Sequence, residues 1–588
     1  MMSSQLHEVM APPGDFPHRT PRPLPFELAQ HAGIFFEEKL YTRALDLLFN
    51  TLASGTFASS AVIVPLPQHL GLAATLLVHP STTTRAKLNE EKEAPDVALR
   101  LLRLYSAQIN PLKAKYDVAF SFTHSNLSRS GRRYHEEHGE KNGSELSHSE
   151  KRPLNLPLGT TEAVWSRAED FWHVVGWAFN CSVLHPERWE SWQIWMRYMC
   201  EVIEDDWCQR EKAYEESQNQ PEREVETSGL DEAVRRSGRG APQKPDGLDI
   251  FRQSLIFQYI SVGTRNGRAR RIMRAIFADG STASINEFRQ VFSKELVSAR
   301  LQDDTGKSNK REREVDIDQD LYGDYMPDDS DDEPMSGTGA SPPRASSPLD
   351  DESQVRRSKR TRRGTRLASV KTASEIPEPE RSPAGQQHHS VGGVSQLGGL
   401  GSLGLRKKLL GILSRVSDRL GKDFVGLDEL YQHFAENIRR QPLLVFQAFV
   451  SPLVLPELDD EAQSTLCEYL VHSMIESAAR ASHVDRLTDQ KLEECFLPFA
   501  AAAASALDNA KFSILLEALV TLLASRGFIK QSPSLKKAVQ TGIDRRAQRT
   551  QEESHRGHGR KNKDVLDWSC LLESGERLNF LVGLLPEH

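Results

Sequence analysis

A chain of 588 residues is long enough for two to four domains, and its formal net charge of -8 argues against an overall positive field that would hold nucleic acid. Hydrophobic residues make up only 38% of the chain, which predicts folded regions separated by polar segments. The mean hydropathy is -0.51, and no window approaches the roughly 20 uninterrupted apolar residues of a membrane helix, so a membrane-spanning protein is excluded.

The cysteines and the N-terminus indicate an intracellular protein. The six cysteines lie in apolar helical patterns and none belongs to a Cys-x-x-Cys pair, so we expect reduced core residues. Residues 1–25 are polar and contain prolines, without the apolar run of a secretory signal peptide. We expect this N-terminus to be disordered.

Residues 26–123 are predicted to form a helical N-terminal part. Its expected helices are Phe26–Phe36, Tyr41–Leu52, Pro67–Val78 and Pro95–Ile109, and residues 118–122 are either a strand or a helix end. Residues 124–158 are rich in Ser, His, Glu and Gly and predict a flexible insertion. The insertion contains His135 and His138, but their i,i+3 spacing is not that of a zinc protease helix, so we interpret it as a solvated loop without a metal.

Seven of the eight tryptophans lie between residues 160 and 210. Trp165, Trp172 and Phe179 recur every seven residues, which predicts one helix that is capped by Thr160 or Thr161 and ends before His185-Pro186. A second helix follows, and the antiparallel pair would anchor a region over 160–300 that packs with 26–123. The predicted structural core is Trp165, Trp172, Trp177, Trp189, Trp192 and Trp195. A partner groove and an aromatic cage for a methylated cation are the alternatives.

Residues 214–247 predict a polar loop, followed by amphipathic helices around Phe251–Tyr259, Ile272–Phe277 and Ile285–Leu296. Between the first two lie five arginines that are candidates for phosphate contacts: Arg265, Arg268, Arg270, Arg271 and Arg274. The alternative is a solvated helix start that pairs with carboxylates such as Glu204–Asp206.

Residues 301–400 are predicted to be a disordered linker with separated charges. Residues 314–333 hold ten acids and no base, and residues 355–371 hold eight bases and no acid. The basic run predicts a nuclear import signal, with an importin as partner, formed by Arg356, Arg357, Lys359, Arg360, Arg362, Arg363 and Arg366. A nucleic-acid arm or a merely solvated polyampholyte are the alternatives. Candidate phosphorylation sites are Ser330, Ser341, Ser347, Ser358, Ser369 and Ser382.

A second helical domain is predicted over 405–545, with the short connections of stacked antiparallel helices in a HEAT-like array. Residues 546–563 are charged and are expected to be disordered. The apolar segment 564–588 is expected to dock onto the chain's own domain, or else to bind another protein.

The sequence carries no phosphate loop, no nucleophile elbow and no calcium loop, so we expect neither an enzyme nor a metal or cofactor. The predicted fold class is all-α, with two helical modules of hairpin or HEAT-like type separated by the long disordered linker. The predicted function is a nuclear scaffold or adaptor, with a cytoplasmic pool allowed, whose helical modules bind protein partners and whose linker regulates it by phosphorylation. The alternative is a chromatin- or RNA-associated protein that contacts phosphates through residues 265–274 and 356–366.

Overall fold

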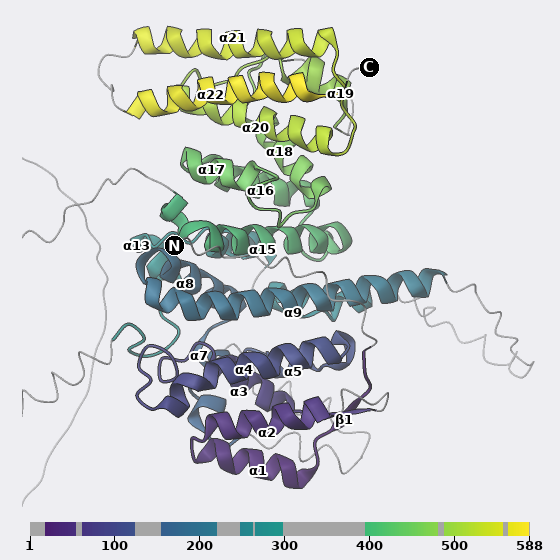
Figure 1. The fold of residues 1–588 in the computed structure, drawn as a ribbon, viewed down its shortest axis with the longest axis vertical. Coiled ribbons are helices and arrows are strands. Elements are labelled where there is room, and N and C mark those ends of the chain that lie inside the picture. The colour runs from purple at the N-terminus through teal and green to yellow at the C-terminus, as the bar shows by residue number, and fades with distance from the viewer. Residues whose placement is uncertain are drawn as a thin grey trace, which may run out of the picture. The chain divides into compact units, whose positions relative to one another are not determined.

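The computed structural model describes residues 18–54, 61–123, 154–219, 247–262, 265–297, 394–479, 487–556 and 563–586. Helices make up nearly all of the regular structure in these ranges (Figure 1), so the predicted all-α class is confirmed. The one sheet described pairs β1 (Pro21–Pro23) in parallel with β2 (Val62–Val64). No described helix combines the length and the apolar character needed to cross a membrane.

The N-terminal helices follow the predicted pattern with one shifted start. The first two predicted helices are α1 (Phe26–Glu37) and α2 (Tyr41–Ser54), which pack on each other. Helix α2 also packs on α4 (Asn89–Gln108), which in turn contacts α3 (Pro67–Leu76). Helix α4 begins six residues before Pro95, because the Glu91 carboxylate accepts the backbone N–H groups of Lys87 and Leu88 and completes the first turn. Residues 111–119 form the short helices η1 (Pro111–Lys113) and α5 (Tyr116–Ala119).

The prediction of a single helix capped by Thr160 or Thr161 is wrong. After η4 (Pro157–Gly159), the chain forms α7 (Val164–Arg167), leaves the helix at Ala168 and begins α8 (Phe171–Leu184). The Asp170 carboxylate caps α8 by accepting the His173 backbone N–H at 2.8 Å. Trp165 and Trp172 therefore belong to different helices, although their spacing suggests one face.

Helix α9 (Pro186–Asn219) begins at the predicted proline and extends six residues into the expected polar loop. It packs against α8 (Figure 1), and all seven tryptophans of this region are buried, with Trp189 the most exposed at 8%. An indole buried this deeply contacts only the protein's own side chains, so these residues offer neither an open groove nor an aromatic cage.

The segment after residue 247 is less helical than predicted. The first expected helix is divided into α10 (Asp249–Arg252) and α11 (Leu255–Ser261), because the Ser254 hydroxyl caps the second piece. Then follow α12 (Arg265–Ile276) and α13 (Thr282–Glu287). The third expected helix ends at Glu287, and Phe288 is buried in irregular chain against Gly176, where a Cβ atom would lie 2.2 Å from the Phe288 ring.

The glycine-rich sequence before Leu405 is helical, not linker. After η6 (Val394–Leu397), helix α15 (Gly399–Leu420) starts behind Gly398, which has a φ of 82°. A Cβ atom on Gly398 would lie 2.2 Å from the Ser182 hydroxyl oxygen. Glycine is required here because the helix start lies directly against α8.

The C-terminal region is a succession of helices, listed here with their bounds: α16 (Leu427–Arg439), α17 (Leu443–Val450), α18 (Asp460–Met474), α19 (Asp489–Lys491), the π-helical turn η7 (Leu492–Phe496), α20 (Ala506–Ser525), α21 (Pro533–Arg556) and α22 (Lys563–Leu584). Asp459 caps α18 as predicted, whereas α21 continues well into the stretch expected to be disordered. Helix α22 packs on α20 and α21, and Gln531 donates to the Pro586 carbonyl at 2.9 Å, so α21 and α22 are antiparallel (Figure 1).

The helical regions on either side of residues 306–390 belong to one compact unit. Buried Arg406 of α15 donates to the carbonyls of Ile276 and Ala278 at the end of α12, at 2.5 and 2.8 Å. Lys408 of α15 forms an ion pair of 2.7 Å with Glu204 of α9. Glu204, which the sequence suggested as a partner for the arginines of α12, thus pairs with Lys408 of α15.

Candidate binding groove

A groove of about 310 Å³ lies where β1, the start of α1, the entrance to α3 and the segment after α4 meet. Twelve residues line it: Pro21, Arg22, Pro23, Leu24, Phe26, Val64, Pro65, Leu66, Pro67, Tyr105, Lys113 and Lys115. They come from three separate parts of the chain. Most are apolar or proline, and the charged ones are all basic.

Two proline-rich segments build the walls of the groove. In the parallel pair, Pro21 lies opposite Val62 and Pro23 opposite Val64, and the Val62 N–H donates to the Thr20 carbonyl at 3.0 Å. Proline has no N–H, so β1 offers few donors along its length and presents ring carbons in their place. The walls are therefore stiff and apolar before any ligand enters.

The floor of the groove is held in place by Tyr105 of α4. Its ring is buried, its hydroxyl donates to the Ala114 carbonyl at 2.8 Å, and burial raises its pKa, so the phenol stays neutral. With its only polar atom already bonded, this side chain contributes an apolar surface. At the rim, Phe26 is 61% exposed although it is the first residue of α1. An aromatic side chain left in water beside an apolar groove is typical of a contact surface.

The electrostatics of the groove are positive. The basic side chains of Arg22, Lys113 and Lys115 are exposed, and no acidic residue is among the twelve that line the groove. Helices α1 and α3 both begin at the groove, behind Pro25 and Leu66, and neither N-cap accepts a backbone N–H through its side chain. The partial positive charge of two helix N-termini adds to that of the three cations.

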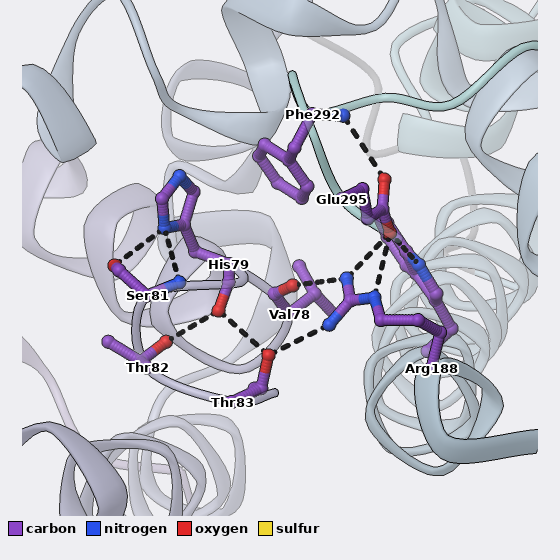
Figure 2. Close-up of polar contacts among 9 residues, drawn as sticks. Val78, His79, Ser81, Thr82, Thr83, Arg188, Phe292 and Glu295 are labelled. Carbon is purple, nitrogen blue, oxygen red and sulfur yellow. Dashed lines mark hydrogen bonds and ion pairs between the residues drawn. The ribbon is translucent and has the colours of Figure 1, made fainter. Parts of the chain in front are cut away.

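A buried polar cluster lies elsewhere, where α9 meets the segment after α3 and the end of the N-terminal region (Figure 2). Glu295 accepts from Arg188 Nε at 2.9 Å and from the Trp192 indole at 2.8 Å, and its other oxygen accepts the Phe292 N–H at 3.1 Å. Arg188 also donates to the Thr83 hydroxyl at 2.8 Å and to a backbone carbonyl at 2.6 Å. Each side-chain nitrogen of Arg188 and each carboxylate oxygen of Glu295 thus has a hydrogen-bond partner inside the protein.

His79 in this cluster is not suited to acid–base chemistry. Its Nδ1 lies 2.7 Å from the Ser81 hydroxyl, only two residues along the chain, and its ring contacts Phe292 edge-on at 4.8 Å. Burial, helped by nearby arginines, lowers the pKa of His79 to about 3. The imidazole is therefore neutral at physiological pH and a weak base. A cleft of about 420 Å³ borders Arg188 and Glu295, but both side chains are buried and bonded to the protein itself, so we interpret the cluster as structural.

The arginines predicted to contact phosphate are partly neutralised by the protein itself. Arg271 forms ion pairs with Asp170 and, at 3.5 Å, with Glu169, whereas Arg274 pairs with Glu287 at 2.7 Å. The side chain of Arg265 lies outside the described residues. Arg271 and Arg274 thus link α12 to the start of α8 and to α13. The sequence had left open whether these arginines contact phosphate or pair with carboxylates of the protein.

Other predicted sites lie outside the described residues: the import signal at Arg356–Arg366, the six candidate phosphorylation sites and the pair His135 and His138. The cysteines are free, and burial raises the pKa of Cys200 and Cys467 to about 12, so these thiols are protonated and unreactive. In the ranges that the structure describes, no cluster of His, Cys, Asp and Glu is placed to hold a metal ion.

Comparisons of the chain with protein-family models, with curated proteins and with solved structures gave no match. The groove must therefore be interpreted from its own geometry. The sequence predicted a disordered N-terminus over residues 1–25, which is wrong for Pro21–Pro23, because they pair with Val62–Val64 as β1. It indicated Phe26 and Pro67 only as helix starts. The available signal was two similar motifs, Pro-Arg-Pro-Leu-Pro at residue 21, directly before α1, and Val-Pro-Leu-Pro at residue 64, whose last proline is the first residue of α3.

Proposed function

We propose that this protein is a non-enzymatic helical scaffold that binds a short segment of a partner protein in the groove between β1, α1, α3 and η1. The observation that carries the proposal is the composition of the groove: proline walls, an apolar floor at Tyr105 and an exposed aromatic rim at Phe26. Such a surface gains free energy by covering apolar area, at about 25 cal/mol per Å² removed from water.

The residues that line the groove favour binding over catalysis. Among the twelve there is no carboxylate, imidazole, thiol or aliphatic hydroxyl, and the amines of Lys113 and Lys115 are exposed at the surface of the protein. The single phenol, that of Tyr105, donates its hydrogen bond to the Ala114 carbonyl. A rigid groove of this kind selects an extended segment by shape and does not transform it.

The second part of the proposal is nuclear location, supported by the seven basic residues within Arg356–Arg366. In this scheme importin binds the basic run, and phosphorylation at Ser358 weakens that contact by partly neutralising it. Replacing the seven basic residues with glutamine is expected to leave a tagged chain in the cytoplasm. A variant that stays nuclear would show the import assignment to be wrong.

The groove is tested by affinity purification with quantitative mass spectrometry on full-length variants. Phe26→Asp places a charge on the apolar rim and is expected to remove a discrete set of partners. Phe528→Asp is the matched control, because Phe528 is a similarly exposed aromatic residue, 69% accessible, that does not line the groove. Equal recovery of every partner with both variants, at wild-type solubility and melting temperature, would refute binding in the groove.

A further inference from the structure

Building on the proposed function, we infer that the groove is specific for an acidic segment that carries an aromatic side chain. The proposed function requires only an apolar contact surface. The charge of the groove and the shape of its walls add the chemical class of the ligand.

The cationic rim is the first argument. Arg22, Lys113 and Lys115 surround an apolar surface in a chain whose formal net charge is -8. Nearby carboxylates do exist, at Glu27 in the first turn of α1 and Asp117 in α5, but neither lines the groove. A local positive field on a negatively charged protein attracts acidic segments and repels basic ones.

The backbone gives a second, independent argument of the same sign. Helices α1 and α3, of 12 and 10 residues, both point their N-terminal ends at the groove. Their N-cap residues, Pro25 and Leu66, provide no side-chain acceptor for the first-turn N–H groups. In α3 Pro67 has no N–H and the His69 N–H donates to the Leu66 carbonyl at 2.9 Å, so α1 provides most of the open donors, where a carboxylate of the ligand takes the place of an Asp or Ser cap.

The walls select the apolar part of the ligand. Four of the twelve lining residues are prolines, and the Tyr105 ring forms part of the floor with its hydroxyl turned to Ala114. Flat aromatic rings pack well against proline rings and add little conformational entropy on binding. A volume of about 310 Å³ is at the small end of ligand pockets, which suits a single anchoring side chain with its flanking backbone.

The experiment is a selection from a random peptide library displayed on phage, with the full-length chain as bait. The expected peptides share an aromatic residue flanked by Asp or Glu. The best of them, labelled with fluorescein, is expected to lose at least tenfold in affinity for the Lys113→Glu, Lys115→Glu variant. Lys536→Glu, Lys537→Glu is the matched control, because these exposed lysines of α21 do not line the groove. Its affinity should equal that of the wild type.

Since the substituted lysines are exposed, the variants should have the melting temperature of the wild type. The neutral variant Lys113→Gln, Lys115→Gln should bind the peptide with an affinity between that of the wild type and that of the charge-reversed variant. Selected peptides that are neutral or basic, or acidic peptides that bind the charge-reversed variant unchanged, would overturn the inference while the proposed function stands. A library that yields no peptide sensitive to Phe26→Asp would overturn the proposed function itself, and the inference with it.

Discussion

Replacing Glu295 with glutamine tests whether the buried ion pair with Arg188 holds separate parts of the N-terminal region together. Glu295 is 1% exposed and Arg188 is 3% exposed. Glu295 accepts hydrogen bonds from the Arg188 guanidinium and the Phe292 N–H (Figure 2), and also from the Trp192 indole. A glutamine has the same shape but carries no charge, and its amide nitrogen would face one of these donors. Arg188 would then be a buried cation without a counter-ion.

The expected cost follows from this geometry. Removing one partner of a buried, hydrogen-bonded ion pair typically destabilises a protein by about 3–5 kcal/mol. In the double variant Arg188→Met, Glu295→Gln the uncompensated charge is gone, so it should cost less than the sum of the single variants by about 1 kcal/mol or more. The matched control is Glu287→Gln, which breaks the pair with Arg274. The Arg274 side chain is 55% exposed, so the Glu287→Gln variant is expected to lose at most about 1 kcal/mol in the free energy of unfolding.

Urea unfolding followed by tryptophan fluorescence measures these differences, because the seven buried indoles report on the same core. The reasoning fails if Glu295→Gln lies within about 1 kcal/mol of the wild type, or if it costs no more than Glu287→Gln. It also fails if the costs of Arg188→Met and Glu295→Gln simply add, because additive costs would mean that the pair is not coupled.

Further predictions concern buried titratable groups. Burial lowers the pKa of His69 to about 4 and that of His79 to about 3, whereas the unfolded chain binds these protons near pH 6.5. The free energy of unfolding should therefore not depend on these histidines above pH 6.5. It should fall by up to about 1.4 kcal/mol per pH unit for each histidine as the pH drops from 6.5 toward 4. In unfolding titrations at several pH values, the variant His69→Leu should show a smaller slope of the free energy of unfolding against pH. An unchanged slope in this variant would count against the assignment. Arg406→Met should cost on the order of 2 kcal/mol, because two buried carbonyls lose their donor while a buried charge is removed. Hydrogen exchange should show faster opening at the end of α12, and wild-type protection there would contradict the role given to Arg406.

Helix boundaries show where local rules work. The pattern of apolar residues and the prolines placed the starts of α1, α2, α3 and α9 correctly, because each depends on a few neighbouring residues. The break before α8 was missed, although Asp170 is a good helix cap, because the spacing of Trp165 and Trp172 matched a continuous helix. Periodicity cannot distinguish one helix from two that bury the same core.

Buried charged residues and the groove show where those local rules fail. Helical periodicity and aromatic size act through neighbouring residues, so the sequence alone is enough to predict a helical chain with seven buried tryptophans between residues 160 and 210. That Arg188, Glu295 and Arg406 are also inside follows only from the fold, since each is hydrogen-bonded to a partner more than 100 residues away. The groove is of the same kind. Its prolines, lysines and Phe26 have no common pattern along the chain. They lie on one surface only because β1 pairs with β2, α1 packs on α2, and α2 and α3 both pack on α4.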